Sequence, residues 1–267
     1  MSGILNTYKP EYIINLAARL PWDLTPTDVS GFSETNIAKL NTFLQTCKPY
    51  TDDGTVKHII HQSSMMAYVE NINSVNKVPA TAFDYNPLPY SVTKGSGSNI
   101  AFFYTLTLSM PITQIFPAHV FGGGNMHPQD VFLQFQYAIQ NGQKILMPRL
   151  YTEGHRDLFV HVDDLVDIYV GTLLEGSKQK KLHVNNPQGY MSLYELAKRI
   201  VQQITHTRNY SDYITIVDAP VSIPDKSGFS LSSDLDRCYI PKKSIYSEIQ
   251  KMPYDGTGTY NGVIRSG

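Results

Sequence analysis

Residues 57–64, Lys-His-Ile-Ile-His-Gln-Ser-Ser, and residues 89–94, Pro-Tyr-Ser-Val-Thr-Lys, are the stretches that decide the fold. The first is a short apolar run of strand length that ends in two serines, and the second opens a long helical pattern. Tyr90 and Lys94 are one helical turn apart, so both side chains can point to one face. Together the two stretches predict a buried strand that brings hydroxyl groups to the start of a helix.

Apolar runs alternate with helical patterns along the rest of the chain. The expected buried strands are residues 11–17, 57–63, 111–117 and 181–185, and the expected helices are residues 34–47, 90–108, 129–141 and 192–205. Strands separated by helices predict an α/β fold with a parallel sheet. Residues 70–89, rich in Asn and Pro, predict a surface loop, and residues 207–267 predict a less regular lobe.

The composition is that of a globular chain of 267 residues with a formal charge of −1 and no basic stripe, which excludes nucleic acid as a partner. No run approaches the roughly 18 apolar residues of a membrane span, and the N-terminus lacks a basic and then apolar signal. We therefore expect a cytoplasmic protein without a membrane partner. Cys47 and Cys238 are too few for a disulfide framework, and His58 and His61 fall on opposite faces of a strand, so no metal site is expected.

Tyr90, Lys94 and the serines that end the strand are the candidate catalytic groups. A phenol has a pKa near ~10 in water, but a neighbouring ammonium and a hydroxyl that stabilises the phenolate can bring that pKa towards neutrality. Tyr90 is then the acid–base group, Lys94 supplies the ammonium that lowers the pKa of the phenol, and a serine of residues 63–64 supplies the hydroxyl.

The spacing Tyr-x-x-x-Lys alone does not select this pair, because it occurs three times in the sequence. Tyr194 and Lys198 lie in a predicted amphipathic helix, with Lys198 expected in solvent. Tyr239 and Lys243 lie in a tail that prolines interrupt. Only the pair in residues 89–94 follows a strand that ends in serines, so its context selects it.

Several segments resemble the extended short-chain dehydrogenase/reductase family, which contains nucleotide-sugar epimerases, dehydratases and reductases. Residues 10–18 resemble a strand that ends in His-Leu-Ala-Ala, with Asn15 in place of His, and Asn36 resembles the Asn that opens the next helix. Residues 63–68 resemble the segment with the catalytic Ser or Thr, which places that role on Ser64. Residues 117–122 resemble an Asn-Val-Tyr-Gly turn with His119 in place of Asn, and residues 156–164 resemble an Arg-Asp-Phe-x-x-Val-x-Asp run.

The resemblance implies an incomplete Rossmann-like parallel sheet flanked by helices, with a smaller irregular C-terminal substrate lobe. The implied boundaries are residues 1–116 and 155–190 for the partial core, and residues 117–154 and 191–267 for the substrate-binding lobe. The implied cofactor is NAD or NADP, and the implied substrate is a nucleotide sugar. The implied cofactor-binding residues are Leu16, Ala17, Ala18, Asn36, Tyr90 and Lys94, and the implied substrate-binding residues are His119 and Arg156.

The family's first three strands, its Gly-x-x-Gly-x-x-Gly turn and its acidic ribose-binding residue have no counterpart in this sequence. The glycines of that turn let the backbone approach the dinucleotide pyrophosphate, so we expect this chain alone to bind NAD weakly. Gly95-Ser96-Gly97 is expected to loosen its helix instead. Residues 12–17 should form an apolar sheet edge, for which we expect a homo-oligomer or a partner that supplies a strand.

Three further assignments concern charged side chains and one histidine. Arg156 has two interpretations, because its planar fork suits either a substrate diphosphate or an ion pair with Asp157, Asp163 or Asp164. Asp163 and Asp164 are expected to cap and charge the helix that follows them. His127 is expected to be a loop histidine.

Met65 and Met66 stand where the family's 4,6-dehydratases have an Asp-Glu pair, and thioethers cannot transfer protons. Dehydration by that mechanism is therefore not expected. The first hypothesis is an NAD(P)-dependent nucleotide-sugar epimerase or 4-keto-sugar reductase, and the intact candidate catalytic residues favour it. The second is a non-catalytic relative that acts as a binding or assembly module. The missing glycine turn favours it, as does Lys39, where the family has a small Gly, so whether the chain is an enzyme stays open.

Overall fold

The computed structural model describes residues 1–20, 29–68, 89–123, 126–127, 130–152, 156–175, 180–184, 186, 191–218 and 242–249. The loop predicted over residues 70–89 lies outside them except for Pro89, and so does the greater part of residues 207–267.

A parallel sheet forms the larger part of the molecule. Its strands are β1 (Tyr12–Asn15), β2 (His58–Gln62), β3 (Ile112–Pro117) and β8 (Lys181–Val184), in the order β1-β2-β3-β8. Every neighbouring pair is parallel. The predicted α/β fold is therefore confirmed. In the described part of the chain, β1 is an edge strand with β2 as its neighbour.

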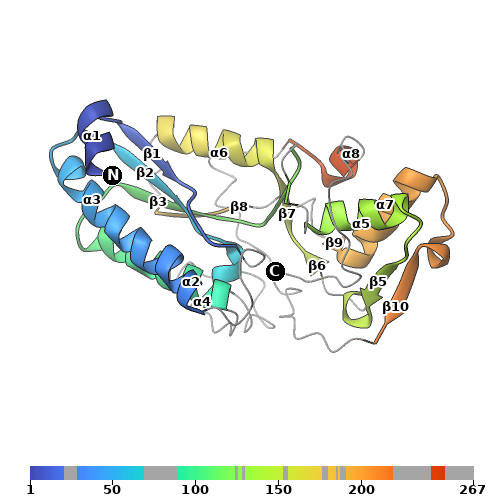
Figure 1. Cartoon of the computed structure of the whole chain (residues 1–267). Helices are drawn as coiled ribbons and strands as arrows, with labels where there is room; N and C mark the ends of the chain where they lie inside the picture. Colours follow the sequence, from blue (N-terminus) through green and yellow to red (C-terminus); the bar gives the residue numbers. More distant parts are fainter. Residues whose placement is uncertain are drawn as a thin grey trace.

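Helices cover both faces of this sheet. The segment α2 (Val29–Ser33), π-helix η1 (Glu34–Lys39) and α3 (Leu40–Asp52) lies with α4 (Pro89–Leu106) on one face, and α6 (Val162–Glu175) lies on the other (Figure 1). Successive side chains of a strand point to opposite faces. Ile59 accordingly packs with Leu44 and Ala101 beneath the first layer, whereas Ile60 packs with Leu165 beneath α6.

Gly97 lies where α4 crosses closest to η1. A Cβ atom at this position would come within 2.5 Å of the backbone oxygen of Asn36. Only a residue without a side chain permits this approach. The expectation that Gly95 and Gly97 loosen the helix is thus wrong, because α4 runs without interruption from Pro89 to Leu106.

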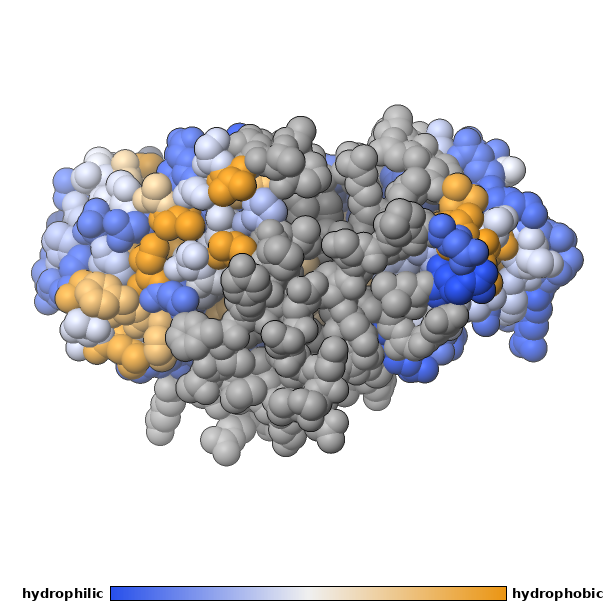
Figure 2. Space-filling view, turned by 90° about the horizontal axis from the view of Figure 1, so that it is seen from below, coloured by the Kyte–Doolittle hydropathy of each residue, from blue (hydrophilic) through white to orange (hydrophobic). Residues whose placement is uncertain are grey.

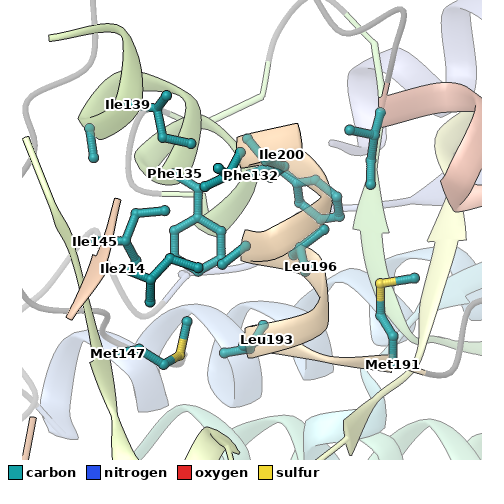
Figure 3. Close-up of a cluster of buried hydrophobic side chains, with 14 of the residues drawn as sticks. Phe132, Phe135, Ile139, Ile145, Met147, Met191, Leu193, Leu196, Ile200 and Ile214 are labelled. Atoms are coloured by element: carbon teal, nitrogen blue, oxygen red, sulfur yellow. The ribbon is translucent and has the colours of Figure 1, made fainter. Parts of the chain in front are cut away.

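A second hydrophobic core lies beyond the carboxyl ends of the strands. Helix α5 (Val131–Gln140) and helix α7 (Leu193–Thr205) pack against β5 (Ile145–Pro148) and β10 (Ile214–Val217), which pair in parallel. Figure 3 shows this core, in which Phe135 and Leu196 are fully buried. Helix α8 (Ile245–Glu248) adds Ile245 to the same cluster.

Ser192 fixes the start of α7 through a capping box. Its hydroxyl accepts from the Glu195 backbone N–H, and the Glu195 carboxylate accepts from the Ser192 N–H, each at 3.0 Å. Both bonds satisfy backbone donors that the first helical turn leaves unpaired.

Two small strand pairs connect the two cores. Strand β4 (His119–Phe121) runs parallel to β7 (Phe159–His161), and β6 (Arg156–Asp157) pairs antiparallel with β9 (Met191–Ser192). Short 3-10 turns occur at η2 (Met65–Tyr68), η3 (Arg149–Thr152) and η5 (Tyr210–Asp212). Helix α1 (Ser2–Tyr8), which the sequence analysis missed, buries Leu5 against α3. Among the described helices, none has both the length and the apolar character needed to cross a bilayer.

Candidate active site

Ser64, Tyr90 and Lys94 meet at the carboxyl edge of the sheet. Ser64 follows the end of β2, with only Ser63 between them. Tyr90 and Lys94 lie in the first turns of α4. The Ser64 side chain is hydrogen-bonded to the Tyr90 phenol. The structure therefore places together the three residues that the sequence selected as catalytic.

Lys94 is buried and is held by the main chain of β2. Its ammonium donates to the Gln62 carbonyl oxygen at 2.9 Å. Gln62 comes directly after His61, which lies opposite Asn15 at the last paired position of β1 and β2. Burial lowers the pKa of Lys94 to about 8. The side chain thus carries a positive charge at neutral pH although it is buried.

Tyr90 titrates differently from the expectation. Burial raises the pKa of its phenol, and the hydrogen bond with Ser64 opposes this rise only in part. The predicted shift towards neutrality is wrong for this arrangement, because loss of solvent disfavours the phenolate more than the hydroxyl stabilises it. Tyr90 is consequently a proton donor at neutral pH.

The buried imidazole of His61 lies near Lys94, and its place in the site was not predicted from the sequence. His61 lies opposite Asn15 in the strand register. The Ala17 N–H donates to Asn15 Oδ1 at 3.2 Å, and Asn15 Nδ2 lies 3.4 Å from His61 Nδ1. Because the amide turns its NH₂ to the ring, His61 Nδ1 is the acceptor and Nε2 carries the hydrogen. Burial, with repulsion from Lys94, lowers the pKa of His61 to about 3, so the ring is neutral.

The predicted cofactor-binding segment follows Asn15 at the end of β1. Leu16 is 54% exposed, and Ala17 is exposed beside it, with Ala18 half-buried. Asn36 is buried instead. Its Oδ1 accepts from the Arg19 N–H at 2.9 Å, and its Nδ2 donates to Thr93 Oγ1 at 3.1 Å. Asn36 thereby ties the segment after β1 to the helix of Tyr90 and Lys94.

His119 begins β4, immediately beyond β3. Its Nε2 lies 3.1 Å from Asp130 Oδ2, and Asp130 is the N-cap of α5. No local pattern predicts this pair, since the two residues are eleven positions apart in the chain.

Arg156 pairs with Glu195, and Asp164 contacts a later segment of the chain. Arg156 Nη2 forms an ion pair with Glu195 Oε1 at 3.3 Å. Asp164 lies in the first turn of α6, but its carboxylate accepts from the backbone N–H groups of Lys242 and Lys243 at 3.2 and 3.0 Å. Asp164 thereby holds residues 242–243 against α6, an interaction that the predicted capping role did not include.

The second Tyr-x-x-x-Lys pair, Tyr194 and Lys198, lies on α7, away from this edge (Figure 1). Lys198 packs over the Tyr194 ring at 4.2 Å on α7 rather than extending into solvent. Tyr239 is outside the described residues. Within the described ranges, no group of three His, Cys, Asp or Glu side chains is arranged to hold a metal ion.

Solved structures share this fold. A UDP-glucose 4-epimerase from Thermotoga maritima, with UDP-glucose, gives a TM-score of 0.77 at 20% identity and covers 93% of this chain and 78% of that one. A UDP-glucuronic acid 4-epimerase from Bacillus cereus, in complex with UDP-glucuronic acid and NAD, gives a TM-score of 0.73 at 17% identity. The match covers 96% of this chain and 77% of the epimerase chain. A dTDP-glucose 4,6-dehydratase from Bacillus anthracis, in complex with NAD, gives a TM-score of 0.75 at 18% identity. The match covers 94% of this chain and 73% of the dehydratase chain.

Sequence comparison leads to the same group. A dTDP-D-glucose 4,6-dehydratase of Dictyostelium discoideum is 23% identical over 210 residues, which are 75% of this chain and 46% of that protein. This chain thus spans about half the length of that curated relative. The model of the NAD dependent epimerase/dehydratase family matches residues 1–186, which is more than half of the chain. The chain therefore belongs to the NAD dependent epimerase/dehydratase family.

Proposed function

We propose that this chain carries the acid–base site of an NAD(P)-dependent nucleotide-sugar 4-epimerase or 4-keto-sugar reductase. The observation that carries the proposal is the hydrogen bond between Ser64 and Tyr90 at the carboxyl edge of the sheet, one helical turn before the buried Lys94. Ligands of open α/β sheets bind at this edge. A phenol that donates a proton beside a hydroxyl that holds the same oxygen suits the reduction of a ketone.

The residues present fit the nicotinamide half of a dinucleotide. Leu16 and Ala17 are exposed at the end of β1, and the ammonium of Lys94 is anchored on the Gln62 carbonyl at the end of the neighbouring strand β2. The relatives from Bacillus cereus and Bacillus anthracis hold NAD. This sequence has no Gly-x-x-Gly-x-x-Gly turn, so we assign only the nicotinamide half to these residues.

A bound nicotinamide supplies or accepts the hydride at the sugar's C4. Tyr90 moves the proton at the oxygen on C4, and its raised pKa keeps the phenol protonated and ready to donate. Ser64 holds the same oxygen through its hydroxyl. Lys94, anchored on the Gln62 carbonyl, keeps a positive charge beside the site and so favours the phenolate that remains after donation.

We assign the sugar nucleotide to the lobe of residues 117–154 and 191–267, and the cofactor to residues 1–116 and 155–190. The Arg156 side chain is 41% exposed while it pairs with Glu195, and its planar fork suits the paired oxygens of a diphosphate. His119 lies at the entrance from β3 to this lobe. The epimerases from Bacillus cereus and Thermotoga maritima hold UDP-glucuronic acid and UDP-glucose.

A homo-oligomer or a strand-supplying partner is part of the proposal. Ile14 on the edge strand β1 is 41% exposed, although its neighbour Ile60 on the same face is buried. On α4, Val92, Phe103 and Leu106 are exposed on one stripe. Seen from below, apolar side chains gather on the half of the molecule where Figure 1 places α3 and α4 (Figure 2).

A non-catalytic binding module is the second candidate. Two observations favour it: the sequence lacks the glycine turn, and Lys39, where the family has a small Gly, forms an exposed ion pair with Glu34 at 3.0 Å. Such a relative would bind a sugar nucleotide without turning it over.

The deciding experiment measures NADH-dependent reduction of dTDP-4-keto-6-deoxyglucose and 4-epimerisation of UDP-glucose. Each reaction is run with the chain alone and with a separately expressed dinucleotide-binding strand–turn–helix segment. Tyr90→Phe should lower turnover by about two to four orders of magnitude, because it removes the proton donor. Ser64→Ala should also lower it, and Tyr194→Phe should not.

Equal losses for Tyr90→Phe and Tyr194→Phe would contradict the assignment of the site. Sugar-nucleotide binding without turnover in either setting would support the non-catalytic module.

A further inference from the structure

Gln62, the last residue of β2, makes hydrogen bonds to helices on both faces of the sheet. Its main-chain carbonyl accepts from the Lys94 ammonium of α4 at 2.9 Å. Its side-chain Oε1 accepts from the Tyr169 phenol of α6 at 2.5 Å. Helices α4 and α6 lie on opposite faces of the sheet (Figure 1). One residue at the strand end therefore connects the candidate catalytic lysine to a phenol on the far side of the sheet.

Gln62 lies where the pairing of β1 with β2 ends. The last pair of that register is Asn15 with His61, one residue before Gln62. Inside a sheet, the ladder of hydrogen bonds fixes the direction of each carbonyl. At a strand end fewer ladder bonds act, so the side-chain contacts of the residue take a larger part in fixing its carbonyl. For Gln62, the side-chain contact is the phenol of Tyr169.

Tyr169 is a firm anchor for the Gln62 side chain. It is 6% exposed and packs in one buried cluster with Ile60 and Leu165. Burial raises the pKa of its phenol far above the ordinary value, so the hydroxyl stays protonated and donates. The direction of the Gln62 side chain is thus set by α6, a helix of 14 residues.

We propose that Tyr169 is a positioning residue of the candidate active site, which fixes through Gln62 the carbonyl that holds the Lys94 ammonium. The inference rests on the proposed function, because that function gives Lys94 its role of favouring the phenolate of Tyr90. Tyr169 acts only through Gln62, from the face of the sheet opposite α4.

The Gln62 carbonyl stabilises the charged form of Lys94, because an ammonium is a stronger donor than a neutral amine. When the carbonyl turns away, burial acts on Lys94 without this compensation, and its pKa falls below the value of about 8. Two titratable groups close to Lys94 keep their protonation states between pH 6 and pH 9.5. The pKa of His61 is lowered to about 3, so its ring is neutral, and burial raises the pKa of Tyr90.

The charge of Lys94 is measured by NMR on the full chain with isotope-labelled lysine, without cofactor or substrate. The Lys94 signal is identified by its loss in Lys94→Met, and its chemical shift is followed from pH 6 to pH 9.5. We expect a wild-type midpoint near the pKa of about 8. In Tyr169→Phe the midpoint should fall by about half a pH unit, because the bond to the carbonyl weakens.

Two further variants test the route and its specificity. Gln62→Met keeps the main-chain carbonyl and a side chain of similar volume, but it removes the acceptor of the phenol. It should lower the midpoint as much as Tyr169→Phe, and the double variant should lower it no further, because both changes remove one contact. Tyr104→Phe is the matched control. Tyr104 is also 6% exposed, but its phenol donates to Asn41 Oδ1 at 3.0 Å, so this variant should titrate like the wild type.

The catalytic consequence depends on pH. At pH 8, a midpoint lower by half a unit leaves about half as many chains with a charged Lys94, whereas at pH 6 nearly all chains keep the charge. In the NADH-dependent assay, Tyr169→Phe should therefore lower kcat about twofold at pH 8 and leave it unchanged at pH 6. The KM for the sugar nucleotide should not change. A loss of packing alone would lower kcat at both pH values.

An unchanged or raised midpoint in Tyr169→Phe overturns the inference, and so does an equal fall in Tyr104→Phe or a further fall in the double variant. A wild-type midpoint in Gln62→Met also overturns it, and this variant decides where Tyr169→Phe does not fold. The NMR titration involves no turnover, so a fall that depends on Tyr169 and Gln62 supports the positioning role even where the NADH-dependent assay fails. Failure of the proposed function and failure of this inference are therefore distinguishable.

Discussion

Replacing Lys94 with Met should stabilise the fold at neutral pH while removing a candidate catalytic residue. The pKa of Lys94 is about 8 in the folded chain, against 10.5 for the ordinary side chain. The unfolded state therefore binds the proton more tightly, and the charged side chain destabilises the fold by about 3 kcal/mol at pH 7. Met fills a similar volume but loses the hydrogen bond to Gln62, which costs about 1 kcal/mol. The net expectation is a gain of about 2 kcal/mol.

The free energy of unfolding of the wild type should depend on pH because the pKa of Lys94 differs between the folded and unfolded states. Between about pH 8 and 10.5 the unfolded state holds more protons than the folded state, so the wild-type free energy of unfolding rises with pH. At pH 9.5 the destabilisation by Lys94 falls to about 1 kcal/mol, which the lost hydrogen bond offsets. Lys94→Met and the wild type should then unfold at nearly the same denaturant concentration.

Urea denaturation at pH 7 and at pH 9.5 measures the difference in the free energy of unfolding between Lys94→Met and the wild type. Lys198→Met is the matched control, because Lys198 has the same spacing from a tyrosine but packs over the Tyr194 ring on α7. Its difference from the wild type should not change between the two pH values. The reasoning is refuted if Lys94→Met unfolds at lower urea than the wild type at pH 7 and keeps that difference at pH 9.5.

Two further pairs of substitutions test the edge strand and the helix crossing. Ile14→Lys should reduce concentration-dependent association in sedimentation experiments, because a charge on β1 opposes strand addition at that edge; Ile216→Lys on β10, where Ile216 is also 41% exposed, should reduce it less. Equal effects would assign association to general hydrophobicity. Gly97→Ala should destabilise the fold by about 1–3 kcal/mol, because its Cβ would meet the Asn36 oxygen at 2.5 Å. Gly171→Ala in α6, where a Cβ meets nothing within 4 Å, should instead stabilise by about 0.5–1 kcal/mol in thermal unfolding, and a reversed order would contradict the close approach.

The sequence by itself determined the sheet and the position of the candidate site. Apolar runs of strand length and helical periodicity are local properties, so they located β1, β2, β3 and β8 and the helices between them. The alternation of strands and helices made the sheet parallel. A strand that ends in Ser-Ser ahead of the helix of Tyr90 and Lys94, together with the resemblance to the family, selected Ser64, Tyr90 and Lys94 as one site.

Tertiary structure alone decided which distant groups meet and how they titrate. Strands β5 and β10 are four residues each and pair across a long separation, so no local pattern distinguishes them. The contacts of His61 with Asn15 and of His119 with Asp130 depend on strand register and on the position of a helix cap. The pKa of Tyr90 is raised because desolvation depends on what packs around the phenol, and packing is a property of the folded chain that residue spacing does not contain.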